Sequence, residues 1–262
     1  MLLHIIKIKF ISFLYFLTKF NLVNRVFGEI KKIESVKSLN YENNIFKFID
    51  RNYITNYRFS TFATKEPDTL KWIKEMKPNS VFWDIGANVG LYSVFAAKTI
   101  SAQVFAFEPS FLNLELLYKN ININQLTDSI TIIPIALNNK CEEGYFQLGR
   151  ADQGGAISTF LDKDNKGKKN INSYKTISIT PSKLQEIFLL KSPDFIKIDV
   201  DGLEFEILQS LENFFADTKS ILVEINQNNK SEYENIQNIL KKNNFYLSDK
   251  GMNANQIWYK KY

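Results

Sequence analysis

The chain has 262 residues, 45% of them hydrophobic and 14% aromatic, which suffices for one substantial domain with its own core, with or without a small appendage. The net charge of +5 resides in residues 1–40, and the neutral remainder argues against a nucleic-acid enzyme with a basic face around its site. A single cysteine, Cys141, excludes an intrachain disulfide and a cysteine-based zinc site, and it fits the reducing cytoplasm. The single histidine, His4, leaves the body of the chain without a histidine general base.

Residues 1–60 are expected to form an N-terminal arm, and residues 61–262 the main domain. The apolar run Phe10–Leu17 is too short to span a bilayer, and no small-residue cleavage site of a signal peptide follows it. For residues 1–30 we expect a helix that packs on the domain or on a second subunit, or one that lies on the anionic inner face of a membrane; a signal segment is a third interpretation. Strands are expected at 45–49 and 53–59.

From Glu66 onward the signals of strands and helices alternate. After a helix that Pro67 begins, strands are expected at 81–85, 103–107, 130–135, 196–200 and 220–225. Helices are expected at 91–99, 110–123, 202–211 and 231–242, and an antiparallel pair at 245–248 and 256–259. Such alternation predicts an α/β fold whose mostly parallel sheet has helices on both faces and an antiparallel hairpin at its edge.

Residues 141–180 form an insertion that is longer than a simple crossover between two strands. A long insertion at the edge of an α/β sheet usually shapes a site. Arg150 and Gln153, beside the glycines at 149, 154 and 155, are therefore candidates for contact with a substrate. The charged stretch 162–169 predicts a solvated hairpin with a mobile tip.

The stretch Ser80–Tyr92 contains a strand that ends in an acid, a glycine turn and the start of a helix. Backbone N–H groups at such a helix start bind nucleotide-containing ligands. The pattern is D-x-G-x-N-x-G and not the G-x-G-x-x-G of dinucleotide enzymes. The acid, Asp84, would repel a pyrophosphate but suits the amino group of a cationic ligand such as S-adenosylmethionine.

Within this turn, Gly86 and Gly90 let the backbone approach a ligand, and Asn88 tolerates a positive φ. Tyr92 follows the turn and could reach the cofactor or the acceptor. Glu108, 18 residues after Gly90, ends the next strand, where an acid can accept both hydroxyls of a ribose.

Three stretches resemble, in this order, the motif blocks of the FkbM family of S-adenosylmethionine-dependent methyltransferases: V-F-W-D-I-G-A-N-V-G-L-Y-S, F-A-F-E-P-S-F-L-N and I-K-I-D-V-D-G-L-E-F-E-I-L. The resemblance runs from about Glu66 to Glu224 and implies a class I methyltransferase fold, which is Rossmann-like and has seven strands. It implies that S-adenosylmethionine is the cofactor, with its adenine near Ala136 and its ribose on Glu108. Its methionine part would be lined by Asp84, Gly86, Asn88 and Gly90.

Family members are mostly O-methyltransferases of sugars or natural products, so the resemblance implies that a hydroxyl of a sugar, glycan or other small metabolite is the acceptor. Other open interpretations are a cofactor-binding assembly subunit without turnover, or methylation of another acceptor such as an amine or a nucleic acid, although no nucleic-acid partner is expected. The chain departs from the family at Asp201, where the family's D-V-E-G motif has a glutamate.

A hydroxyl acceptor has to lose a proton during methyl transfer, to a base or with the help of a cation. Asp199 and Asp201 are the candidates, either as base and positioning residue or as ligands that share a divalent metal ion. In the alternative, Asp199 contacts only the cofactor or a loop, and Asp201 caps the next helix. Glu224, at the end of the last parallel strand, is a further candidate for the cleft.

Overall fold

The computed structural model describes residues 2–17, 25, 34–150, 152–156, 158–162, 172–226, 229–248 and 254–261. The chain divides into two compact units, Met1–Val36 and Lys37–Tyr262.

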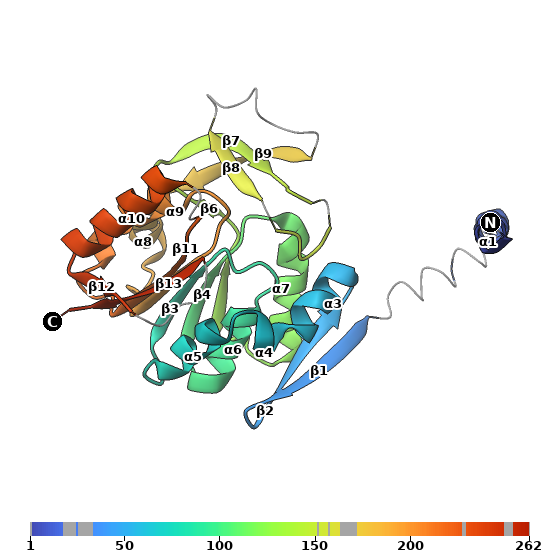
Figure 1. Ribbon diagram of the computed structural model, residues 1–262, viewed down its shortest axis with the longest axis horizontal. Coiled ribbons are helices and arrows are strands. Elements are labelled where there is room, and N and C mark those ends of the chain that lie inside the picture. The colour runs from blue at the N-terminus through green and yellow to red at the C-terminus, as the bar shows by residue number, and fades with distance from the viewer. Residues whose placement is uncertain are drawn as a thin grey trace. The chain divides into compact units, whose positions relative to one another are not determined.

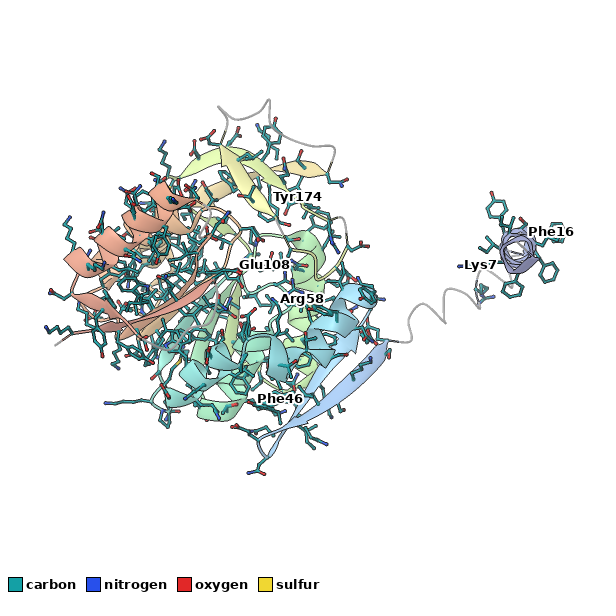
Figure 2. All side chains as sticks on the ribbon, viewed as in Figure 1. Lys7, Phe16, Phe46, Arg58, Glu108 and Tyr174 are labelled. Atoms are coloured by element: carbon teal, nitrogen blue, oxygen red, sulfur yellow. The ribbon has the colours of Figure 1, made fainter. Side chains whose placement is uncertain are left out.

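Helix α1 (Leu2–Leu17) belongs to the first unit, and Figure 2 shows the side chains of Lys7 and Phe16 projecting from it. Its length of about 24 Å is less than the roughly 30 Å of a bilayer core. None of the helices in the described part of the chain has the length and apolar character needed to cross a membrane. Membrane-surface binding and subunit packing of residues 1–30 both stay predictions.

A seven-stranded sheet forms the centre of the second unit, in the order β12-β13-β11-β10-β3-β4-β5 (Figure 1). The strands β3, β4, β5, β10 and β11 are parallel, and β13 pairs antiparallel with β11 and β12. Their bounds are β3 Val81–Ile85, β4 Gln103–Phe107, β5 Ile130–Ile133, β10 Phe195–Ile198, β11 Ser220–Glu224, β12 Phe245–Leu247 and β13 Asn255–Lys260. The predicted seven-stranded fold with its antiparallel edge hairpin is thus confirmed.

Two core clusters cover the two faces of this sheet because neighbouring residues of a strand point to opposite sides. Phe82 packs toward α5, α6 and α7, whereas Trp83 packs toward α8, α9 and α10, as the arrangement in Figure 1 shows. The helices are α5 Pro67–Glu75, α6 Leu91–Ile100, α7 Phe111–Ile123, α8 Pro181–Phe188, α9 Glu204–Ser210 and α10 Lys230–Lys242, with a 3-10 turn, η2, at Glu212–Phe214.

The segment before α5 contains the hairpin β1 (Ser35–Tyr41) and β2 (Asn44–Asp50), then α3 (Tyr53–Ser60) and α4 (Phe62–Lys65). The strand predicted at 53–59 is wrong: Asn52 and Thr55 form a reciprocal capping box that begins α3 there. Phe46 stacks near Phe95 in the core, so residues 37–60 belong to the same compact unit as the sheet, although the sequence groups them with the arm.

The insertion builds a second, four-stranded sheet in the order β6-β9-β7-β8. Its strands are β6 Ala136–Leu137, β7 Glu142–Gln147, β8 Thr159–Asp162 and β9 Ser173–Ile179. Phe146 and Phe160 form its small core with Ala136 and Leu148. The predicted hairpin tip lies largely outside the described residues. This sheet places its core beside the carboxyl ends of the parallel strands.

Candidate active site

The glycine turn connects β3 to α6 at the carboxyl edge of the sheet. Gly86 and Gly90 both have a φ of +84°, and Asn88 has a φ of +53°, as the sequence predicts for this turn. A Cβ on Gly86 would lie 1.8 Å from the backbone oxygen of Asp199, and one on Gly90 would lie 2.5 Å from Leu117 Cδ1. The turn therefore requires glycine for packing within the chain itself, in addition to any approach of a ligand.

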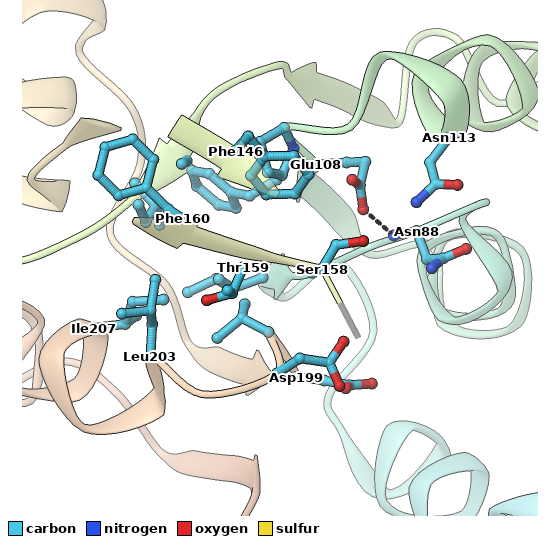
Figure 3. Close-up of a pocket in the computed structure, with 18 of the residues that line it drawn as sticks. Asn88, Glu108, Asn113, Phe146, Ser158, Thr159, Phe160, Asp199, Leu203 and Ile207 are labelled. Atoms are coloured by element: carbon cyan, nitrogen blue, oxygen red, sulfur yellow. Dashed lines mark hydrogen bonds between the residues drawn. The ribbon is translucent and has the colours of Figure 1, made fainter. Parts of the chain in front are cut away.

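A cavity opens beside this turn, between the strand ends and the inserted sheet (Figure 3). Apolar side chains, among them Phe146, Phe160 and Leu203, gather at one end, whereas the polar groups of Asn88 and Glu108 lie at the other. Of the predicted site residues, the cavity is lined by Gly86, Asn88, Glu108, Ala136, Asp199 and Asp201.

Glu108 is 4% exposed and interacts with donors of the glycine turn and of the start of α7. Its Oε2 accepts the backbone N–H of Asn88 at 2.7 Å, the bond drawn in Figure 3, and its Oε1 accepts that of Ser110 at 2.8 Å. The Asn113 side chain is a third partner. Burial raises the pKa of Glu108 to about 7, although these hydrogen bonds act in the opposite direction. Roughly one of the about four acceptor positions of a carboxylate then remains for a ligand hydroxyl.

Asp84 lies under the turn, fully buried, and does not line the cavity. Its Oδ2 accepts the hydroxyl of Ser93 at 2.6 Å, but its Oδ1 has no hydrogen-bond partner among the described residues. Burial raises the pKa of Asp84, and the nearby ammonium of Lys197, 3.9 Å from Oδ1, acts against that rise. A buried carboxylate oxygen without a hydrogen bond is costly, so this atom suits a further cationic donor.

Lys197 is a candidate site residue that the sequence analysis missed. It is 1% exposed, and its Nζ lies 2.8 Å from Asp199 Oδ2 and 5.1 Å from the ring centroid of Tyr92. Burial lowers the pKa of Lys197, but Asp199, Asp84 and Glu66 outweigh burial and raise it above its usual range. The sequence did contain a signal for this residue, a lysine inside the apolar strand F-I-K-I. A central strand of a parallel sheet is buried on both faces, so the pattern indicates a buried lysine.

The hydroxyl of Tyr92 binds another side chain of the same chain, since it donates to Glu66 Oε2 at 2.7 Å. Burial and the Glu66 carboxylate raise the pKa of Tyr92 far above its usual range. Burial also disfavours ionisation of Glu66, but Lys197 and Lys65 outweigh it and lower the pKa of that carboxyl. Tyr92 thus connects the start of α5 to the lysine.

Asp201 is exposed, with a φ of +59°, and it lines the cavity together with Asp199. It does not cap the next helix: the N-cap position of α9 is Leu203, and Glu204 accepts the N–H of Gly202 at 3.0 Å. Within the described part of the chain, no group of three or more His, Cys, Asp and Glu side chains could hold a metal ion. The structure therefore gives the predicted divalent metal no support.

Arg150 and Gln153 lie near the cavity but do not line it. Arg150 is exposed, and Gln153 donates from Nε2 to Glu115 Oε2 at 2.7 Å. The insertion reaches the cavity instead through Phe146 and residues 155, 156 and 158–160. Asn88 holds this segment, since its Nδ2 donates to the oxygen of Gly155 at 2.8 Å.

Residues 84–247 match the model of the methyltransferase FkbM domain. The chain is 26% identical over 165 residues to hexuronic acid methyltransferase AglP of Haloferax volcanii, with coverage of 61% of this chain and 62% of AglP. It is 24% identical over 185 residues to methyltransferase sdnD of Sordaria araneosa, with coverage of 58% and 68%. The solved precorrin-6y C5,15-methyltransferase of Geobacter metallireducens GS-15 superposes with a TM-score of 0.45 and 13% identity, over 74% of this chain and 86% of that one. Since the family match spans more than half of this sequence, the chain belongs to the FkbM methyltransferase family.

Proposed function

We propose that this methyltransferase uses S-adenosylmethionine to methylate a hydroxyl group of a sugar. The observation that carries the choice of cofactor is Oδ1 of buried Asp84 beneath the glycine turn, which accepts no hydrogen bond from the described residues and has Lys197 Nζ only at 3.9 Å. Among the described residues near it, the carboxylates of Asp199 and Glu66 outnumber the one buried cation, Lys197. A ligand that carries both an ammonium and a sulfonium group would offset this negative charge.

The rest of the cavity fits the other parts of this cofactor. Asp199, which lines the cavity, and the charge of buried Asp84 would attract its amino group, and Glu108, with Asn88 and Asn113 beside it, would hold ribose hydroxyls. The apolar end of the cavity, near Ala136 and Phe146, would hold the adenine. When bound, the cofactor supplies an activated methyl group on a sulfonium, whose leaving group is neutral. The chain then has to orient the acceptor, exclude water and accept a proton.

A polar groove beside the cavity supports a sugar as the acceptor. It shares Thr159, Phe160, Asp201 and Leu203 with the cavity, and the amide and charged side chains in its wall are Asn138, Asn139, Lys140, Glu142, Asp162 and Glu206. Such side chains can donate to and accept from the hydroxyls of a sugar. The relative AglP is named a hexuronic acid methyltransferase, which makes a hexuronide one candidate acceptor.

Two measurements test the proposal. Calorimetry would measure S-adenosylmethionine binding to the full chain, and labelled cofactor would measure methyl transfer to methyl glucoside, methyl glucuronide and methyl glucosaminide. We expect binding, and transfer to at least one glycoside. Asp84→Asn, which keeps the shape of the side chain, should weaken cofactor binding. Binding without transfer to any glycoside would contradict the proposed acceptor and favour a cofactor-binding subunit. Absence of binding would contradict the proposed cofactor.

A further inference from the structure

Asp199 and Glu224 lie side by side at the carboxyl ends of β10 and β11. These strands are parallel and pair Ile198 with Val223, which places the next residue of each chain segment at the same level of the sheet. Each of the two carboxyl groups alters the ionisation of the other. Neighbouring carboxyl groups resist the ionisation of both at once, so this arrangement favours one proton shared by the pair.

Lys197 decides which member of the pair is ionised. Its Nζ lies 2.8 Å from Asp199 Oδ2. Burial disfavours the ionised form of Asp199, but the lysine outweighs burial and lowers the pKa of this carboxyl well below its usual range. The hydrogen bond to ionised Asp199, the charge of Asp199 and burial together raise the pKa of Glu224 to about 8. Glu224 thus holds the shared proton at neutral pH.

The neighbouring charges come from β10 itself and from α4, the start of α5 and β3. Lys197 of β10 favours ionisation of Glu224, whereas Glu66 at the start of α5 opposes it. Lys65 acts on Asp199 in the same direction as Lys197. Asp84 of β3 lies on the far side of the lysine and helps to keep it charged. The pair therefore titrates in a fixed surrounding of two cations and two acids.

We propose that Glu224 accepts the proton of the acceptor hydroxyl, and that Asp199 and Lys197 set its basicity; this inference rests on the proposed function. Asp199 lines the cavity, and Glu224, which is half-buried, is its neighbour across the parallel pair β10 and β11. The O–H bond of the acceptor breaks, and its proton moves to a carboxylate oxygen of Glu224. The electron pair of that bond forms the new bond to the methyl carbon, and the carbon–sulfur electron pair stays on sulfur as a neutral thioether.

Glu224 suits this role better than the two aspartates that the sequence singles out. Asp199 is a weak base because Lys197 stabilises its ionised form, and Asp201 is exposed to solvent. A base works best when its pKa lies near the operating pH. The active form has both members of the pair ionised, so the rate of transfer should rise as the pH passes through about 8.

The proton can be followed without any ligand, by infrared titration of the full chain between about pH 5 and pH 10. We expect a carboxylic acid component that disappears with a midpoint near 8 in the wild type, beside the components of Glu108 and Glu204 near 7, and only the component near 8 should be absent in Glu224→Gln. Asp199→Asn should move this midpoint down by at least about one pH unit, because the neighbouring charge is gone. Glu234→Gln, an exposed glutamate of α10, should leave the band unchanged. A wild type without such a band would overturn the shared proton.

The catalytic role is tested with whichever methyl glycoside accepts the methyl group. Glu224→Gln should lower the single-turnover rate by about 10²–10⁴-fold and abolish its rise with pH, while cofactor affinity stays within about threefold. Glu224→Asp should retain part of the rise. Transfer at the wild-type rate in Glu224→Gln would overturn the inference but leave the proposed function standing. If no glycoside is methylated, the proposed function and the base fail together, while the infrared titration still decides whether the proton is shared.

Discussion

Glu108 and Glu224 both stand at the carboxyl edge of the sheet, and both have a raised pKa, about 7 and about 8, for different physical reasons. Burial raises the pKa of Glu108, whose hydrogen-bond partners are backbone N–H groups and an asparagine. The ionised neighbour Asp199 raises the pKa of Glu224. The same direction of shift therefore indicates a site for neutral hydroxyls in one case and a proton-sharing pair in the other.

The difference divides the site into two regions. The region that we propose for the ribose, here called the ribose side, consists of Asn88, Glu108 and Asn113 and contains one acid and no cation. The lysine side consists of Asp84, Lys197, Asp199 and Glu224, with Glu66 behind them. The single buried cation of these two regions lies on the lysine side, which makes Lys197 the residue whose removal should affect the molecule most.

Lys197→Met should cost the lysine side roughly 3–5 kcal/mol of unfolding free energy, because Asp84 and Asp199 lose their shared cation. Denaturant unfolding measures this loss. Lys191→Met is the matched control, since Lys191 is exposed and contacts the side chain of Gln103; it should change stability by less than about 1 kcal/mol. Equal effects of the two substitutions would contradict a buried charge cluster.

Gly86→Ala tests the close packing of the glycine turn against the backbone of Asp199. The new Cβ would lie 1.8 Å from the backbone oxygen of Asp199, in a residue with a φ of +84°, and we expect a loss of about 2–4 kcal/mol in unfolding free energy. Gly202→Ala is its control, because Gly202 has a φ of +110° but nothing within 4 Å of the added atom. A similar loss in both variants would mean that backbone strain and not the clash sets the cost.

The sequence predicted much of the carboxyl edge of the sheet, because regular periodicity and glycine turns are local signals. The parallel strands, the left-handed turn at Asn88 and the strand-end acids all follow from such signals. α3 was missed because a capping box outweighed the aromatic, strand-like composition of its residues. Lys197 was missed because its burial depends on helices on both faces of the sheet, which no single stretch of sequence displays.

The inserted segment was harder to predict for a different reason. Its glycines indicated a turn near the cavity, and the turn is there. Which side chains face inward depends on long-range hydrogen bonds, such as those from Gln153 to Glu115 and from Asn88 to Gly155. These contacts join segments 38 and 67 residues apart, so the sequence showed the segment but not the orientation of its residues.

Glu108→Gln tests the ribose side alone, through cofactor affinity and through the dependence of stability on pH. The glutamine keeps one acceptor oxygen, so cofactor affinity should fall by about 10–100-fold at pH 8, where the wild-type side chain is ionised. The pKa of Glu108 is raised from 4.5 to about 7, so the folded state binds this proton more tightly than the unfolded state does. The free energy of unfolding should therefore fall as the pH rises from about 4.5 to about 7. Glu108→Gln should flatten this part of the stability profile, as thermal unfolding at several pH values would show. An unchanged profile would contradict burial as the cause.

Asp201→Asn should have the smallest effect, and it tests whether the lysine side extends to the cavity rim. Asp201 is exposed, and asparagine tolerates its φ of +59°, so the unfolding free energy should change by less than about 0.5 kcal/mol. If Glu224 is the base, methyl transfer should slow by less than about tenfold, and its rise with pH should persist. Asp201→Glu, which restores the glutamate usual in this family, should then perform no better than the wild type. Loss of the pH dependence in Asp201→Asn would instead place the proton acceptor at the rim and remove the functional contrast between Glu108 and Glu224.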